Sequence, residues 1–111
     1  MITIALRRGK DGRLHGFSVS GHSGYAEHGS DIVCAGVSAI VQTALLGLQE
    51  VLGIECSGYQ VDGELSCCLP EGLSPSLGLQ ADLLLRTMLV GLRELASAYQ
   101  DYVCILDSKE V

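Results

Sequence analysis

The sequence predicts an α+β fold, a two-layer sandwich in which two helices pack on one face of a mainly antiparallel sheet. Twice, two short alternating segments joined by a turn are followed by a long segment whose apolar residues have helical spacing. A further alternating segment completes the order ββαββαβ. With 111 residues, the chain is expected to form a single domain over residues 1–111.

The N-terminal hairpin is predicted from two alternating segments around a turn. "MITIAL" places Ile2, Ile4 and Leu6 on one side, and "GKDG" is typical of turns. "LHGFSVSG" follows as the second strand, and we expect His15 and Phe17 to lie on its core face. The short connection makes the two strands antiparallel neighbours.

The first helix is expected to begin after Ser30, a good N-cap residue, with Asp31 in its first turn. Gly53 is the expected C-cap. Because no charge lies between Asp31 and Glu50, we expect this helix to be buried on most sides. Its apolar positions are Val33, Val37, Ile40, Val41, Ala44, Leu48, Val51 and Leu52.

A second hairpin is predicted around Asp62-Gly63, the strongest short hairpin signal in the chain. A two-residue turn there opposes Val61 to Glu64 and sets the register. The core face then holds Cys56, Leu65, Cys67 and Leu69, and the other face holds Tyr59, Glu64, Ser66 and Cys68.

The last two elements are a helix over residues 76–98 and a short strand, "YVCILD". The apolar residues of this helix spread over more than one side, although a single face would suffice to cover the sheet. Surplus apolar surface on a helix is typical of an interface. We therefore expect a homodimer.

The charge of the chain is acidic and uneven. The formal net charge is -6, and the stretch from Leu14 to Leu85 holds eight acidic residues but no lysine or arginine. Such a field repels nucleic acid, so no direct nucleic-acid partner is expected, and it attracts basic polypeptides. An acidic surface that only interacts with solvent remains the alternative interpretation.

The apolar runs, the N-terminus and the cysteine count indicate the cellular compartment of the protein. No apolar run reaches the roughly 18 residues of a membrane span, and the N-terminus lacks the pattern of a secretory signal. We expect a cytoplasmic protein with no membrane partner. The cysteine count of five is odd, which argues against a disulfide framework and favours reduced thiols.

Cys34 stands out because it falls in the first turn of the predicted helix, after the glycine-rich stretch "GHSGYAEHGS". The dipole and N–H groups of a helix start can lower a thiol pKa, and an imidazole nearby would complete a nucleophile–base pair. The same N–H groups could hold an oxyanion. Packing is the commoner role for a cysteine in an apolar helix, and Asp31 would oppose a thiolate or orient an imidazole.

Three histidines are candidates for the base. His15 lies in a predicted strand and is most simply structural, whereas His22 and His28 lie in the loop before the helix. A metal site is an alternative interpretation of His22, His28 and Cys34. Their spacing matches no standard zinc spacing and lacks a second ligand pair, so neither a metal nor another cofactor is expected.

A resemblance distinguishes between these candidates. "GH" at 21–22 and "GSDIVCAGVSA" at 29–39 resemble the ribosomal-processing cysteine protease (Prp) family, as do "LLLRTMLVGLRELASAY" at 83–99 and the initial "MITI". The resemblance implies that His22 and Cys34 are the catalytic pair. It also implies a cytoplasmic dimer that removes the N-terminal extension of a large-subunit ribosomal protein.

The expected function is therefore that of a cysteine endopeptidase acting on a ribosomal protein precursor with a basic N-terminal extension. Cys34 attacks, His22 transfers the proton, and Asp31 is the candidate orienting residue. The alternatives are a non-catalytic ribosome-assembly module that holds a basic protein, and a thiol-redox protein using Cys67 and Cys68.

Overall fold

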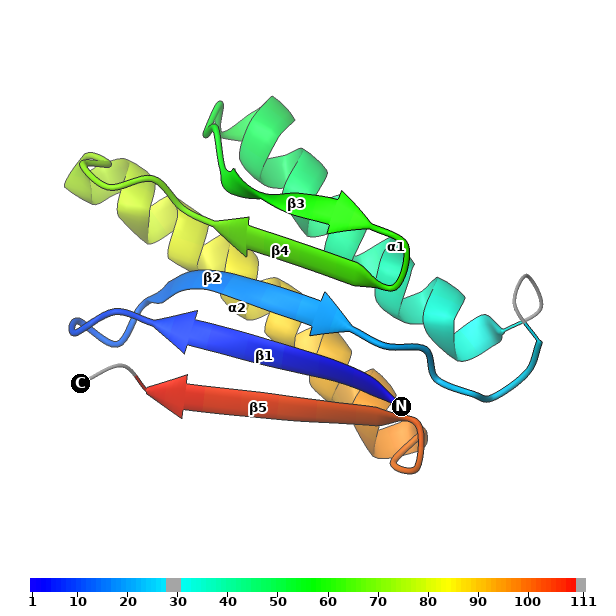
Figure 1. Ribbon diagram of the computed structural model, residues 1–111. Coiled ribbons are helices and arrows are strands. Elements are labelled where there is room, and N and C mark those ends of the chain that lie inside the picture. Colours follow the sequence, from blue (N-terminus) through cyan, green and yellow to red (C-terminus); the bar gives the residue numbers. More distant parts are fainter. Residues whose placement is uncertain (28–30, 110–111) are drawn as a thin grey trace.

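The computed structural model describes residues 1–27 and 31–109, which form two layers. Both long helices lie behind the same face of one five-stranded sheet (Figure 1). The α+β prediction and the order ββαββαβ are thus confirmed. The elements are β1 (Ile2–Arg8), β2 (Leu14–Ser20), α1 (Ile32–Leu46) with a π-helical turn η1 (Gly47–Val51), β3 (Ser57–Val61), β4 (Glu64–Cys68), α2 (Pro75–Ala98) and β5 (Val103–Lys109).

The sheet has the strand order β3-β4-β2-β1-β5. All neighbours are antiparallel except β1 and β5, which run parallel after the crossover through α2. The turn at Asp62-Gly63 pairs Val61 with Glu64, which confirms the predicted register. Because Gly63 has φ +77°, this turn requires the conformational freedom of glycine.

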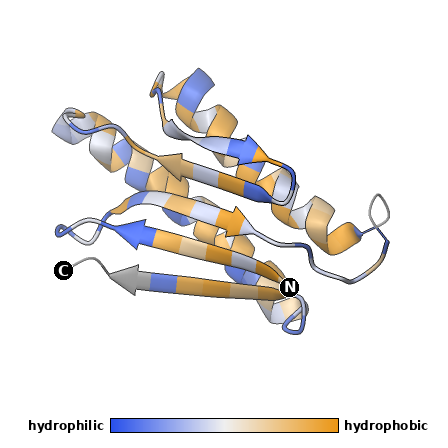
Figure 2. Cartoon of the chain, in the orientation of Figure 1, coloured by the Kyte–Doolittle hydropathy of each residue, from blue (hydrophilic) through white to orange (hydrophobic). Residues whose placement is uncertain are grey.

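The core lies between the sheet and the two helices. Ile2, Ile4 and Leu6 of β1 are almost fully buried, as their alternation predicted. Helix α1 differs from the prediction, because only one of its faces is buried in the chain and Ile32 and Leu46 are more than half exposed. Figure 2 shows apolar residues along α1 and the central strands.

Contrary to the expectation from sequence, the segment Ile32–Val51, in which Glu50 is the one charged residue, is long and apolar enough, by length and composition alone, to cross a membrane. Its Val33, Val37, Val41 and Leu48 nevertheless pack into the core against the sheet. Such packing is that of a core helix in a folded domain.

His15 was predicted to face the core, and this prediction was wrong. Between Arg7 and Arg8 the register of β1 and β2 shifts, so that Gly16 and Leu14 pair while His15 is the extra residue. The bulge buries Leu14 and leaves the His15 side chain 53% exposed, 3.6 Å from Asp11. His15 lines a different cavity from those lined by Cys34 and is not a candidate base.

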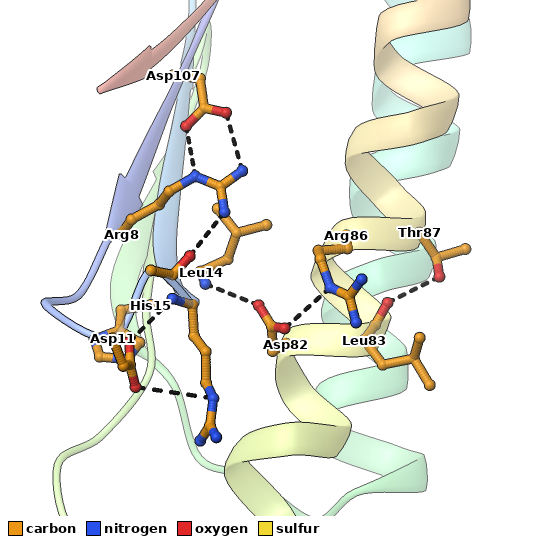
Figure 3. A network of polar contacts seen from close by, with 11 residues as sticks. Arg8, Asp11, Leu14, His15, Asp82, Leu83, Arg86, Thr87 and Asp107 are labelled. Carbon is orange, nitrogen blue, oxygen red and sulfur yellow. Dashed lines mark hydrogen bonds and ion pairs between the residues drawn. The ribbon is translucent and has the colours of Figure 1, made fainter. Parts of the chain in front are cut away.

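A buried carboxylate joins α2 to the sheet (Figure 3). Asp82 accepts a hydrogen bond from the backbone N–H of Leu14 at 2.9 Å and pairs with Arg86 at 3.0 Å. On the sheet, Arg8 binds Asp107 of β5 through both carboxylate oxygens. These contacts fix the end of the sheet opposite the start of α1.

Candidate active site

The start of α1 is capped by Asp31, and not by Ser30 as predicted; Ser30 lies outside the described residues. Oδ1 of Asp31 accepts hydrogen bonds from the backbone N–H groups of Val33 at 3.0 Å and Cys34 at 2.9 Å. An aspartate at the N-cap satisfies donors that the helix itself leaves unpaired.

Asp31 is also held from the preceding loop, because the Ser23 hydroxyl donates to its Oδ2. Burial raises the pKa of the Asp31 carboxyl, but the hydrogen bonds from Ser23 and from Cys34 outweigh it and lower the pKa from 3.8 to about 2. The carboxylate is therefore charged at neutral pH and surrounded by donors.

Cys34 lies half-buried in the first turn of α1. The backbone N–H of Ser23 points at its Sγ, with a nitrogen-to-sulfur distance of 3.4 Å. The N–H of Ala35 bonds the carbonyl of Asp31 at 3.0 Å. Three helix-start N–H groups are thus engaged within the cap, which does not support their predicted role in holding an oxyanion.

His22 is held against the β3–β4 turn, which lies near the N-terminal half of α1 (Figure 1). Gly21 has φ +90° and its N–H donates to the carbonyl of Gly63 at 2.9 Å. The imidazole of His22 packs on Gly63 so closely that a Cβ there would lie 3.2 Å from Nε2. A turn some 40 residues away in the sequence therefore supports the imidazole.

His22 and Cys34 line the same two cavities. Together with Ser38 they line both a cavity of about 170 Å³, which continues toward Val61 and Glu64, and one of about 540 Å³. Asp31 lines the second cavity. The structure thus brings the three predicted site residues to one place, whereas His28 lies outside the described residues.

The walls of these cavities are acidic. Asp31 and Asp62 line the larger cavity and Glu64 the smaller, and among the described residues no lysine or arginine lines either one. Part of the acidic charge of the sequence therefore lies where a ligand of Cys34 would lie. Such walls favour a basic ligand.

The remaining cysteines have other surroundings. Cys67 is 1% exposed, and burial raises its pKa to about 12. Burial likewise raises the pKa of Cys56, which contacts Cys67. Cys68 lies on the opposite face of β4 and accepts a hydrogen bond from Arg7 at 2.8 Å. Because Cys67 and Cys68 point to opposite faces, a vicinal disulfide is not favoured.

Within residues 1–27 and 31–109, no three histidine, cysteine or acidic side chains are grouped to hold a metal ion. His28 is outside these ranges. That the chain needs neither metal nor cofactor stays a prediction.

Two residues of the site were missed from the sequence. Ser23 links the loop to both Asp31 and Cys34, and Gly63 supports His22. The position of Ser23 directly after His22 is the only signal in the sequence. Gly63 was identified as a turn residue, but hairpin chemistry does not tell which side chain will pack on the turn.

The chain is similar to known proteases over nearly its whole length. The family described as cysteine protease Prp matches residues 1–104. The ribosomal processing cysteine protease Prp of Bacillus subtilis (strain 168) is 36% identical over 107 residues, covering 91% of this chain and 92% of that protein. The protein of the same name from Staphylococcus aureus is 28% identical over 106 residues, covering 93% and 95%.

Solved structures support the same assignment at the level of the fold. The S. aureus processing protease Prp with a covalently linked product peptide superposes with a TM-score of 0.87 at 24% identity, covering 97% of this chain and 100% of that one. SMU.848 from Streptococcus mutans has a TM-score of 0.78 at 25% identity, covering 99% and 96%. Fold, family match and sequence identity agree, and the chain belongs to the cysteine protease Prp family.

Proposed function

We propose that Cys34 and His22 are the nucleophile and base of this cysteine protease, and that its substrate is a ribosomal protein precursor with a basic N-terminal extension. One observation carries the assignment of the pair. Both side chains line the same two cavities, so a peptide lying across both would present a bond to the thiol.

The reaction follows from this placement. His22 takes the proton of Cys34, and the thiolate sulfur forms a bond to the scissile carbonyl carbon. The tetrahedral intermediate collapses, the C–N bond breaks, and the leaving amine takes the proton from His22. Water deprotonated by His22 then hydrolyses the acyl-enzyme and returns the thiol.

Asp31 is proposed as the orienting residue, acting through the loop. Its carboxylate holds the hydroxyl of Ser23, the neighbour of His22 in the chain. Fixing that neighbour restricts the backbone from which the imidazole extends. The route is indirect, and it adds to the role of Asp31 as helix cap.

The substrate proposal rests on similarity and charge. The Bacillus subtilis relative is named a ribosomal processing protease, and the S. aureus protease has been solved with a substrate peptide. Ribosomal proteins bind RNA and are basic, which suits cavities lined by Asp31, Asp62 and Glu64. We propose that the protein acts in the cytoplasm, where ribosomal proteins are made.

We propose a homodimer because the outer face of the two helices is apolar and exposed. A further cavity of about 830 Å³, larger than those at Cys34, lies between α1 and α2 and is lined mainly by apolar residues, among them Ile40, Leu83 and Leu84. Leu83 and Val90 are more than half exposed. Sedimentation of the wild type against Leu83→Glu tests this proposal, and a monomeric wild-type protein would contradict it.

The function is tested by incubating the protein with the ribosomal precursor of its own organism and sequencing the new N-terminus. A shortened precursor with wild type and an intact one with Cys34→Ala are expected. A precursor that binds but stays intact with wild type would favour the non-catalytic assembly module.

A further inference from the structure

The helix start at Cys34 leaves an unanswered question about the reaction. Attack on a peptide carbonyl creates an oxyanion close to the sulfur, and a protease lowers the barrier by directing N–H groups at that oxygen. Yet the N–H groups of Val33 and Cys34 bond the Asp31 carboxylate, and that of Ala35 bonds the Asp31 carbonyl.

One backbone donor outside the helix does point at the reacting atoms. The N–H of Ser23 is directed at Sγ of Cys34 with a nitrogen-to-sulfur distance of 3.4 Å. When a carbonyl carbon bonds to this sulfur, its oxygen lies within about 3 Å of the sulfur, so an oxygen on the side of Ser23 comes within hydrogen-bonding reach of the same donor.

Ser23 is held in place from two directions. Its hydroxyl donates to Asp31 and accepts from the backbone N–H of Tyr25 at 3.1 Å, and the residue is only 4% exposed. The ring of Tyr25 in turn contacts Tyr99 and Tyr102, with centroids 5.7 and 5.2 Å away. The loop is thus attached to the helix cap and to the far end of α2.

We infer that the loop backbone at Ser23, and not the first turn of α1, supplies an oxyanion-binding N–H, and that the Ser23 hydroxyl positions it through Asp31. The inference rests on Cys34 being the nucleophile, as proposed above. The Ser23 N–H faces the sulfur in the resting enzyme and donates to the new oxyanion once the C–S bond forms. When the C–N bond breaks, the carbonyl reforms and the amine leaves with the proton from His22.

The hydroxyl has a second effect on the same step. Asp31 is anionic beside Cys34, and its charge opposes the formation of another negative charge. The Ser23 hydroxyl and the two helix N–H groups direct their dipoles at this carboxylate. Removing the hydroxyl therefore loosens the donor and leaves the Asp31 charge less compensated.

The first experiment compares Ser23→Ala with wild type and with Ser18→Ala on β2 as a matched control. The substrate is a fluorogenic peptide that spans the cleavage site. Ser23→Ala is expected to lower kcat roughly 10- to 100-fold, because a hydrogen bond to a charged group is lost, while KM stays unchanged. Ser18→Ala should behave as wild type.

Alkylation of Cys34 by iodoacetamide separates oxyanion binding from thiol reactivity, since this reaction forms no oxyanion. Its plateau rate at alkaline pH, where the thiol is fully ionised, should be the same in Ser23→Ala and wild type. A plateau that falls as much as kcat, or an unchanged kcat, would overturn the inference.

The second experiment removes the donor itself. An ester in place of the Ser23 amide, made with the α-hydroxy acid of serine, deletes only the N–H and should lower kcat about 10²–10³-fold. The same replacement at Tyr25, whose N–H donates to Ser23 Oγ, should lower kcat by a smaller factor. Equal losses would show that loop order alone matters and would overturn the donor role. An inactive wild type, or an active Cys34→Ala, would instead refute the proposed function.

Discussion

Cys34 and Cys67 carry the same side chain in regions of opposite character. Cys34 lies where a loop meets a capped helix, half-buried beside the N–H of Ser23 and two cavities. Cys67 lies in β4, between β3 and β2 of the sheet, 1% exposed, with its pKa raised to about 12 by burial. The contrast teaches that the surroundings of a cysteine, and not the side chain alone, separate a candidate nucleophile at the start of a helix from a packing residue in a strand.

The largest effect should come from Cys34→Ala. We expect loss of cleavage by a factor of about 10⁴ or more, because the covalent step needs the thiolate. The melting temperature should stay near that of wild type, since the side chain is only half-buried. Peptide turnover and thermal melts check both parts, and an active alanine variant would refute the role of Cys34.

A comparable contrast is expected in the chemical reactivity of the two thiols. At pH 8 a thiol of pKa about 12 has roughly one part in 10⁴ as thiolate, so Cys67 should resist iodoacetamide in the folded protein. Cys34 should be labelled first, also below pH 7. Mass spectrometry of peptides after brief labelling checks this, and prior labelling of Cys67 or Cys68 would favour the redox alternative.

His22→Ala should lower turnover about 10²–10⁴-fold, the usual contribution of a general acid–base. His28→Ala is the matched comparison in the same loop and should reduce activity only modestly. Steady-state kinetics on both variants check the choice. An inactive His28→Ala variant beside an active His22→Ala variant would show that His28, and not His22, is the base. Inhibition by a chelator would support the metal hypothesis.

The smallest effect, and one on stability only, is expected for Cys67→Ser. A hydroxyl at this buried position exchanges an apolar contact for a polar group that needs a partner, which costs about 1–3 kcal/mol of unfolding free energy. Activity per folded molecule should be unchanged, the reverse of Cys34→Ala. Denaturant unfolding with active-site titration measures both, and a loss of kcat would place Cys67 in the catalytic machinery.

Local signals were sufficient for most of the fold. The alternation of Ile2, Ile4 and Leu6 predicted the core face of β1, and the Asp62-Gly63 turn predicted the register of its hairpin. Both depend on neighbours a few residues apart, which is the range over which a sequence pattern acts. A motif together with the expected helix start pointed to His22 and Cys34 as the candidate pair, which stays a prediction.

The failures share a different origin. The bulge that turns His15 outward depends on how β1 and β2 pair, and the exposed face of α1 depends on what covers it. Neither follows from the residues of one element.

By itself, then, the sequence determined the elements and their order and indicated the candidate thiol and imidazole, because periodicity, turn chemistry and a motif are local. Only the tertiary structure decided that Asp31 caps the helix, that Gly63 supports His22 and that the N–H of Ser23 faces Sγ of Cys34. These contacts form when a loop, a helix start and a distant hairpin turn pack together. Such packing depends on the shape of the whole core.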